Sequence, residues 1–329
     1  MPADREALRP DAALVARFAA RLDDLWDDAG GEARLAVAVS GGPDSTALLL
    51  LAAAALPGRV EAATVDHGLR PEAADEAAMV AALCARLDVP HETLRVEVAP
   101  GSVQARAREA RYAALAGWME QRALSALATG HHADDQAETL LLRLNRASGV
   151  AGLAGVREYG AVPGTQLPLI RPLLDWRRGD LQAIVEAAAV PVAEDPSNSD
   201  DRFDRVRMRK AIAAADWLDV GALAVSAANI ADADAALSWA ARREWIECVR
   251  EEGPGLAYRP RAPRAVALRV LARMVAELGE SEPRGGAVAR LFESLLAGEP
   301  ASIGDLVVRP LRGAWVMTKS PKPRKAQAV

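Results

Sequence analysis

The stretch Leu35 to Ala52, LAVAVSGGPDSTALLLLA, constrains the fold more than any other part of the sequence. It begins with an apolar run of strand length and ends with an apolar run long enough for a helix. Between the two runs, Ser40 to Ser45 contain two glycines and a proline. Glycines let the chain turn tightly, and the free N–H groups of a first helical turn favour an anion. The stretch therefore predicts a strand, an anion-binding loop and a helix.

Short apolar strands continue to alternate with longer helices on both sides of this loop. Such alternation indicates βαβ units and a doubly wound parallel sheet with helices on both faces. Ligands bind these sheets beyond the carboxyl ends of the strands, where this chain has the polar sequences SGGPDS, DHGLRPE and GHHADD. Helices are expected at residues 12–25, 44–56, 71–87, 103–122 and 133–146, and strands at 34–39, 59–65, 92–98 and 124–129.

The remaining sequence predicts a second, mostly helical domain. We expect a glycine-rich loop at 149–168, a further strand and helix at 167–174 and 178–189, and a proline-rich hinge at GPGLAYRPRAPR. The predicted domains are residues 1–210 and 211–329. In the latter, helices are expected at 211–217, 221–251, 265–278 and 287–296, and a hairpin at 307–317.

Charge and cysteine content narrow the classes of partner. Residues 1–204 carry 20 basic and 31 acidic residues, whereas residues 205–329 carry 20 basic and 14 acidic. The basic C-terminal half predicts a polyanionic partner, although ordinary surface charge gives the same counts. The two cysteines form no C-x-x-C pair, which argues against a disulfide framework, a zinc site or a sulfur relay. We find no secretion signal or run of about 20 apolar residues, so we expect a cytoplasmic protein without a membrane partner.

The glycine loop carries groups suited to phosphate. The hydroxyls of Ser40 and Ser45 add donors, and Asp44 could hold Mg²⁺ against phosphate oxygens together with Asp134. The loop matches neither G-x-x-x-x-G-K-S/T nor G-x-G-x-x-G. The alternative is a capped helix after a glycine turn, with Asp44 or Ser45 as the cap.

A second polar cluster lies within residues 128–156, ATGHHADDQAETLLLRLNRASGVAGLAGV. On a helix that begins near residue 133, Asp135 and Glu138 are three residues apart and share a face, so both carboxylates can point at one site. His131 or His132 could contact a nucleotide. The alternative is that these carboxylates only stabilise the N-terminus of the helix.

SGGPDS after an apolar strand resembles the PP-loop of the N-type ATP pyrophosphatases, which have an adenine-nucleotide α-hydrolase-like fold. These enzymes split ATP between its α and β phosphates and transfer AMP to an oxygen of the substrate. Together with the second cluster, four more motifs give residues 35–209 a resemblance to the tRNA(Ile)-lysidine synthetase family: VDHGLRPE, AREARY, RPLL and EDPSNSDDRFDRVRMR.

The resemblance implies a two-step reaction. ATP, with Mg²⁺, would adenylate the C2 carbonyl oxygen of the wobble cytidine in a CAU-anticodon isoleucine tRNA and release pyrophosphate. Free L-lysine would then displace AMP at C2, and the modified tRNA would read AUA instead of AUG. Residues 1–210 would form the catalytic PP-loop domain, and residues 211–329 a helical linker and a basic tRNA-binding domain. A homodimer is left open.

The resemblance also implies roles for individual residues. ATP would contact the loop and His132, and Mg²⁺ would bind Asp44 and Asp134. The catalytic residues would be Asp44, Asp135 and Glu138. Lysine would be bound by Asp135 and Glu138 and by Arg108 or Arg111, between which the sequence does not decide. The loop residues that would bind ATP are Ser40, Gly41, Gly42, Pro43, Asp44 and Ser45. From the sequence itself, Arg205, Arg207 and Arg209 are assigned to tRNA binding, although they could also contact the nucleotide or form a solvated helix face.

The chain departs from the family pattern at two positions. Val206 stands where an asparagine is usual, so any hydrogen bond from that side chain is lost. Ala147 replaces a frequent glycine, which leads us to expect a negative φ there.

Two other functions compete with this interpretation. A PP-loop enzyme with another acceptor, such as a tRNA thiolase or an amidotransferase-coupled synthetase, is disfavoured by the lack of paired cysteines and of a glutaminase domain. A non-enzymatic RNA- or nucleotide-binding protein is disfavoured by the intact loop and both acidic clusters.

Overall fold

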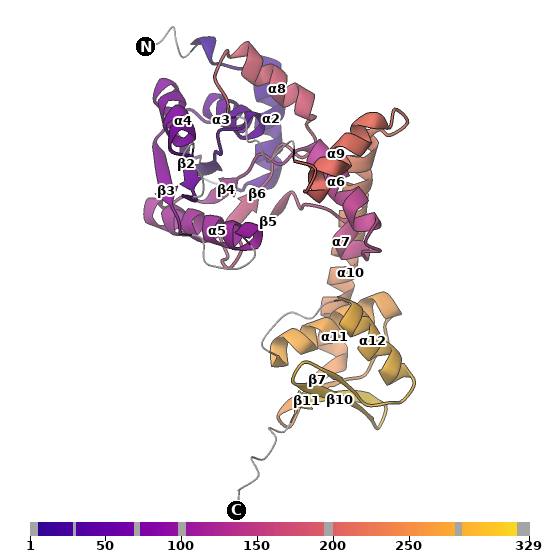
Figure 1. The fold of residues 1–329 in the computed structure, drawn as a ribbon. Coiled ribbons are helices and arrows are strands. Elements are labelled where there is room, and N and C mark those ends of the chain that lie inside the picture. The colour runs from indigo at the N-terminus through magenta and orange to yellow at the C-terminus, as the bar shows by residue number, and fades with distance from the viewer. Residues whose placement is uncertain are drawn as a thin grey trace, which may run out of the picture. The chain divides into compact units, whose positions relative to one another are not determined.

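The computed structural model describes residues 6–28, 31–68, 73–97, 103–193, 200–279 and 285–320 (Figure 1). The chain divides into two compact units, Met1–Ala231 and Asp232–Val329. The division falls within helix α10 (Val220–Cys248), whereas the predicted boundary at residue 210 falls within α9 (Asp204–Ala214). Residues 69–72 of the DHGLRPE motif and residues 194–199 of the EDPSNSDD motif lie outside the described part of the chain.

The first unit contains the predicted parallel sheet. Its six strands have the order β3-β2-β1-β4-β6-β5, and all neighbours are parallel except β5 and β6. The four strands expected before residue 130 are confirmed. Strand β5 and the short helix α7 lie within the predicted glycine-rich loop, so that prediction was wrong in part. The bounds are β1 Leu35–Ala38, β2 Val60–Asp66, β3 His91–Arg95, β4 Ala126–Ala128, β5 Tyr159–Ala161, β6 Pro168–Ile170 and α7 Val150–Leu153.

Helices cover both faces of this sheet, as Figure 1 shows. Leu35 and Val37 of β1 contribute to one core with α2, α3, α4 and α8, whereas Ala36 packs with α5 in the core of the other face. This alternation explains why the strands are apolar throughout. Helix α3 is buried nearly all round, which accounts for its run of four leucines. The bounds are α2 Ala12–Leu25, α3 Pro43–Ala55, α4 Ala73–Leu87, α5 Val103–Arg122, α6 Ala133–Leu144 and α8 Arg178–Ala187.

The second unit combines helices with a five-stranded antiparallel sheet of order β7-β8-β11-β10-β9. The helices α11 and α12 and the hairpin β10–β11 confirm predictions. The prediction of a helix to residue 251 followed by a hinge was wrong, because Val249–Glu252 and Gly255–Tyr258 pair as the hairpin β7–β8. The other bounds are α11 Arg264–Leu278, α12 Gly285–Leu296, β9 Ala301–Ile303, β10 Leu306–Leu311 and β11 Ala314–Lys319.

Helix α10 meets the length and composition test for a membrane span, with a mean hydropathy of 1.3 in its most apolar window. The sequence alone did not lead us to expect such an apolar helix at Val220–Cys248. The helix carries Asp232 and Asp234 in its middle, and Asp234 pairs with Arg269 of α11. Helices of soluble proteins pass the same test, so this property alone is weak evidence for a membrane.

The carboxylate of Glu244 joins α10 to the segment that precedes α11. Its Oε1 accepts hydrogen bonds from the N–H groups of Arg261 at 2.7 Å and Ala262 at 3.0 Å, and from the Tyr258 hydroxyl at 3.2 Å. Burial acts to raise the pKa of Glu244, but these donors lower it overall. The ionised carboxylate therefore stabilises the folded second unit.

We expect Glu244→Gln to lower the free energy of unfolding of this unit by about 1–3 kcal/mol at pH 7, because the hydrogen bonds lose a charged acceptor. Since the folded-state pKa is depressed, the stabilisation is present above the unfolded-state pKa and is lost as the pH falls through the folded-state value. Urea unfolding at pH 7 and in acid measures both effects. The exposed Glu247→Gln, on the same helix, is the control. An equal loss at both pH values would contradict the assignment.

The negative φ expected for Ala147, just after the end of α6, was wrong. The φ of Ala147 is +50°, and the Ser148 N–H donates to the Arg143 carbonyl at 3.0 Å across the end of the helix. A left-handed residue at this position closes many helices and is most often glycine. An L-residue there costs about 1 kcal/mol or more, because its Cβ approaches the carbonyl oxygen.

We therefore expect Ala147→Gly to raise the free energy of unfolding by up to about 1 kcal/mol. Ala211→Gly, at an exposed helical position of α9, should instead lower it by about 1 kcal/mol. Chemical unfolding of the two variants beside the parent chain measures the difference. Destabilisation by both variants would show that the strain at Ala147 is negligible.

Candidate active site

A cleft of about 1230 Å³ lies at the carboxyl ends of β1, β2 and β4 in the first unit. It is lined by the glycine loop, by the ends of these strands, and by residues of α5, α6, α8 and α9. Of the residues predicted for the site, the following line it: Ser40, Gly42, Pro43, Asp44, Ser45, Arg108, Arg111, Asp135, Arg205 and Arg209.

The glycine loop leaves the N-terminus of α3 open toward the cleft. Gly41 has φ +87°, a conformation that strains other residues, and its carbonyl accepts the Ala193 N–H at 2.8 Å. Gly42 is the N-cap and has no side chain, so no side-chain cap bond forms. Ser45 Oγ instead accepts the Ser40 N–H at 3.1 Å and donates to the Gly42 carbonyl at 3.0 Å. The alternative of a helix capped by Asp44 or Ser45 is therefore wrong, and the first turn is suited to an anion.

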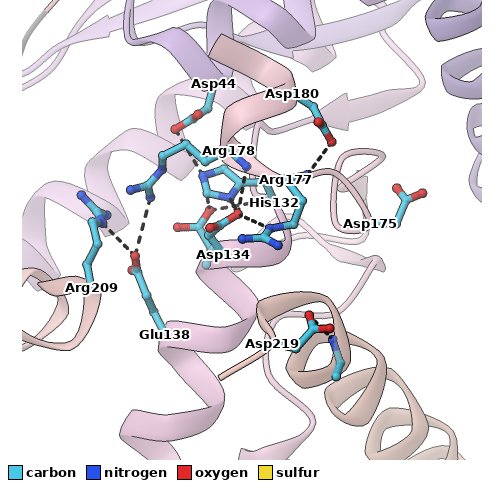
Figure 2. Close-up of polar contacts among 12 residues, drawn as sticks. Asp44, His132, Asp134, Glu138, Asp175, Arg177, Arg178, Asp180, Arg209 and Asp219 are labelled. Atoms are coloured by element: carbon cyan, nitrogen blue, oxygen red, sulfur yellow. Dashed lines mark hydrogen bonds and ion pairs between the residues drawn. The ribbon is translucent and has the colours of Figure 1, made fainter. Parts of the chain in front are cut away.

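Three carboxylates surround the buried imidazole of His132 (Figure 2). Its Nε2 lies 3.4 Å from Asp44 Oδ2 and 3.6 Å from Asp135 Oδ2, and its Nδ1 lies 3.6 Å from Asp134 Oδ2. Burial opposes a charge on this ring, but the three carboxylates raise the pKa of His132 to about 9. His132 is therefore a buried cation that links the loop to the start of α6, and it does not itself line the cleft.

The neighbouring histidine has the opposite protonation state. Burial is the largest influence on the pKa of His131 and lowers it. The charge of Asp135 raises this pKa and the charges of Arg171 and Arg111 lower it, so that the pKa is about 4. Its Nδ1 lies 2.9 Å from Thr129 Oγ1, and the residue lines the cleft. At neutral pH, His131 is thus an uncharged imidazole at the wall of the cleft. Of the two histidines, it is the one placed to contact a ligand.

Asp134 connects α6 to α8. Its Oδ2 accepts the Arg178 N–H at 2.9 Å and the Arg177 Nε–H at 3.3 Å. Burial acts to raise the pKa of Asp134, but His132 and these donors lower it well below its usual range. The carboxylate therefore stays ionised and fixes the first turn of α8 beside the cleft.

Glu138 is buried behind the cleft, with 2% of its surface exposed. Its Oε1 accepts the Arg209 Nε–H at 2.8 Å and lies 3.6 Å from Arg178 Nη2, as Figure 2 shows. The predicted pair on one helical face is thus divided: Asp135 lines the cleft, whereas Glu138 is covered by two arginines that line it.

Arginines also gather around Tyr112 on the α5 side of the cleft. The guanidinium carbons of Arg108 and Arg111 lie 4.9 Å and 5.3 Å from the centre of its ring. Arg171, from the RPLL motif, is 7% exposed and donates to the Arg157 carbonyl at 2.5 Å. Burial lowers the pKa of both Arg111 and Arg171. No carboxylate lies within ion-pair distance of Arg108, Arg111 or Arg171 among the described residues. Arg108 and Arg111 line the cleft, so their wall is suited to an anionic group, whereas Arg171 is buried behind it.

The arginines predicted for tRNA point in different directions. Arg205 lines the cleft, whereas Arg207 is exposed and pairs with Asp204. Arg209 is held by Glu138. Val206 is 5% exposed and also lines the cleft, so its apolar side chain takes part in packing.

Sequence reasoning missed two residues that shape this site. A Cβ on Gly130 would lie 3.0 Å from the Asp44 carbonyl oxygen, so this glycine lets β4 end directly against the loop. Arg178 lines the cleft and contacts both Asp134 and Glu138. Gly130 begins the GHHADD sequence that was predicted to lie at the ligand-binding edge, but the sequence assigned this glycine no role of its own. Arg178 lies in RRGD, where neither spacing nor composition distinguishes it from a surface residue.

Comparison with known proteins identifies the family of the chain. Residues 14–215 match the model of the PP-loop domain family. A tRNA(Ile)-lysidine synthase of Novosphingobium aromaticivorans is 46% identical over 93% of this chain and 95% of its own length. One of Zymomonas mobilis is 39% identical over 89% and 90%.

A solved structure supports the fold alone. The U34-tRNA thiolase of Methanococcus maripaludis aligns with a TM-score of 0.53 and 14% identity, over 66% of this chain and 78% of its own. Because the sequence relatives are similar over nearly their whole length, the chain belongs to the tRNA(Ile)-lysidine synthase family of PP-loop, ATP-using enzymes.

Proposed function

We propose that this chain ligates L-lysine to C2 of the wobble cytidine of a CAU-anticodon isoleucine tRNA, through an adenylated tRNA intermediate. The observation that carries the proposal is the cleft itself, in which an open helix N-terminus for phosphate faces a carboxylate and an arginine wall. Phosphate, a cationic amine and a carboxylate could thus all be bound within one cavity. Free lysine carries a cationic α-amine and a carboxylate, and its side chain ends in a second amine.

The first step requires the phosphates of ATP to be held and their charge to be balanced. We place the pyrophosphate portion at the first turn of α3, where the N–H groups are available and where Ser40 Oγ lies 3.1 Å from Ser45 Oγ at the edge of the cleft. Amides fixed before the reaction stabilise the charge that develops as pyrophosphate leaves. The neutral His131 at the wall could accept or donate a hydrogen bond to the nucleotide or the base.

The donor set fits Mg²⁺. Asp44 Oδ1 is buried and has no hydrogen-bond partner among the described residues. The carboxylates of Asp44 and Asp134 both lie close to the imidazole of His132. No group of three or more metal-ligating side chains occurs in the described ranges, but Mg²⁺ usually binds one or two carboxylates together with substrate phosphates. Asp44 would be the principal ligand, with Asp134 as the predicted second. The ion would neutralise charge on the phosphates.

The second step requires lysine to be oriented. We place an amine of lysine at Asp135, the member of the predicted carboxylate pair that lines the cleft. Glu138 could join it only if Arg209 moved away. Arg111 is the better candidate for the carboxylate of lysine, because Arg108 is exposed whereas Arg111 is partly buried beside His131.

The remaining partners stay predictions of the same proposal. The first unit would bind the anticodon region near Arg205 and Arg207, and the basic C-terminal half would bind the tRNA backbone through phosphates. Such binding should weaken steeply with salt. A homodimer and a cytoplasmic location also belong to the prediction. Light scattering of the protein in solution would measure its oligomeric state.

The proposal is tested by incubating the purified protein with ATP, Mg²⁺, radiolabelled lysine and isoleucine tRNA with a CAU anticodon. We expect label in the tRNA and one AMP for each lysine incorporated. A tRNA with a GAU anticodon is the matched control and should stay unlabelled. Unlabelled CAU tRNA, with folded protein and all substrates present, would overturn the proposal.

A further inference from the structure

Within the second unit, a groove of about 320 Å³ lies between helices α10 and α11. Its lining includes Arg242 of α10 and both Arg269 and Arg273 of α11. We propose that this groove binds one phosphodiester of an unpaired stretch of RNA, and that a neighbouring base stacks on the exposed indole of Trp239. The inference rests on the proposed function, because it names the kind of RNA structure that the second unit contacts in its substrate.

Two arginines of the groove are held in place by contacts within the unit. Arg269 forms an ion pair with Asp234, and its Nη1 donates to Ser238 Oγ at 3.2 Å. The guanidinium carbon of Arg273 lies over the ring of Trp245, 4.0 Å from its centre. Side chains that are already ordered lose less conformational entropy when they bind a ligand. Arg269 and Arg273 therefore give the groove a preorganised wall of N–H donors.

Arg242 supplies the positive charge that is not balanced in this groove. Asp234 balances the charge of Arg269. Glu277 Oε1 lies 3.4 Å from Nε of Arg273. Arg242 is exposed and forms no ion pair with any residue in the part of the chain that the structure describes. A guanidinium presents paired N–H donors to two oxygens of one phosphate, so the groove is suited to the single charge of a phosphodiester.

Trp239 provides an aromatic face beside the groove. It precedes Arg242 by three residues on α10, so the two side chains are neighbours on the helix surface. The residue is 55% exposed, and the guanidinium carbon of Arg243 lies over its ring, 5.2 Å from the centre. Proteins that bind single strands stack nucleobases on such rings, whereas the bases of a duplex are stacked on one another. The exposed indole therefore favours unpaired nucleotides over duplex RNA.

The same face of α10 carries side chains that bear on a membrane as the alternative partner. Ile246, seven residues after Trp239, is 72% exposed on this face. Asp232, seven residues before Trp239, is also exposed there. An anionic membrane would contact the whole face and would meet this carboxylate, whereas one RNA nucleotide contacts only the part beside the groove. We therefore favour RNA over a membrane.

The test of stacking measures the affinity of the full chain for CAU isoleucine tRNA, for an unpaired RNA and for an RNA duplex. We expect Trp239→Leu to weaken binding of the tRNA and of the unpaired RNA on the order of 10-fold, as for loss of one stacked base. Trp239→Phe keeps an aromatic face and should stay within about threefold of the parent chain. Neither variant should alter binding of the duplex. Leu296→Ala, at an exposed apolar position of α12, is the control and should not change any affinity.

The test of the phosphate contact uses Arg242→Gln. We expect this variant to reduce the slope of log Kd against log salt concentration for the unpaired RNA by about 0.7, the contribution of one phosphate in a single strand. Arg290→Gln, at an exposed position of α12 outside the groove, is the matched control and should leave the slope unchanged. Thermal melts check that each variant is folded. If Trp239→Leu does not fold, Arg242→Gln and its control decide alone.

Three results would overturn the inference. The first is binding of unpaired RNA by folded Trp239→Leu and Arg242→Gln with the affinity and salt dependence of the parent chain. The second is an equal loss of affinity for the duplex. The third is co-sedimentation of the parent chain with phosphatidylglycerol vesicles that Arg242→Gln abolishes while RNA binding persists. Because binding is measured without ATP or lysine, these results are distinguishable from failure of the proposed function, in which the parent chain would not label the CAU tRNA.

Discussion

Asp44→Asn should lower kcat/KM for tRNA-dependent pyrophosphate release by about 10²–10³-fold, the range for loss of one electrostatic contact to a transition state. The change keeps the size of the side chain and removes its charge. Oδ1 of Asp44 is buried and unpartnered among the described residues, so it is the oxygen we assign to the cation that accompanies ATP. An amide oxygen binds Mg²⁺ more weakly, and the phosphate charge would be balanced less well.

Asp175→Asn is the matched control for this variant. Asp175 forms an exposed ion pair with Arg17, and Figure 2 shows it apart from the cluster around His132. Exposed pairs contribute about 0–1 kcal/mol, so its loss should change neither folding nor activity appreciably. Activity of Asp44→Asn within threefold of the parent chain would show that Asp44 does not act on the phosphates.

Gly130→Ala should have the second largest effect, a loss of kcat/KM on the order of 10-fold. The added Cβ would lie 3.0 Å from the Asp44 carbonyl oxygen and 3.2 Å from the Ser45 nitrogen, distances that only a shift of the backbone can relieve. Displacement of a catalytic group by 1 Å can cost about 10²-fold in rate, and a shift of a few tenths of an ångström costs less. The loss should fall mainly on the ATP-dependent first step.

Gly117→Ala is the control for the loss of a glycine. A Cβ at Gly117, within α5, meets no atom within 4 Å, and alanine favours a helix. Its activity should equal that of the parent chain. If Gly130→Ala is equally active, the loop tolerates displacement and its close contact with β4 has no functional role.

Much of the first unit was predictable because its signals are local. The leading helix at Ala12–Leu25 and the helix at Val103–Arg122 have the predicted bounds. The apolar strands of a doubly covered sheet differ clearly from amphipathic helices of ten or more residues. The order of the strands could not be read from these local signals. That SGGPDS and GHHADD lie at one site was predictable, because ligands bind parallel sheets beyond the carboxyl ends of the strands.

The errors have physical causes. The strands β7 and β8 have four residues each, and from the sequence the glycines and proline where they meet are equally typical of a hinge. Only the folded structure shows that Gly255 packs against the backbone of Met317. Ala147 takes a positive φ because the end of α6 requires it, whatever residue is present. Spacing placed Asp135 and Glu138 on one face, but which carboxylate reaches the cleft depends on Arg178 and Arg209, distant in sequence.

The most direct test of the account is nucleoside analysis of the tRNA product by mass spectrometry. CAU isoleucine tRNA is treated with ATP, Mg²⁺ and lysine by the parent chain or by Asp44→Asn, and is then digested to nucleosides. We predict that the parent chain converts the wobble cytidine to lysidine and that Asp44→Asn leaves it as cytidine. Pyrophosphate release with cytidine unchanged, or with a sulfur-containing product, would contradict the account.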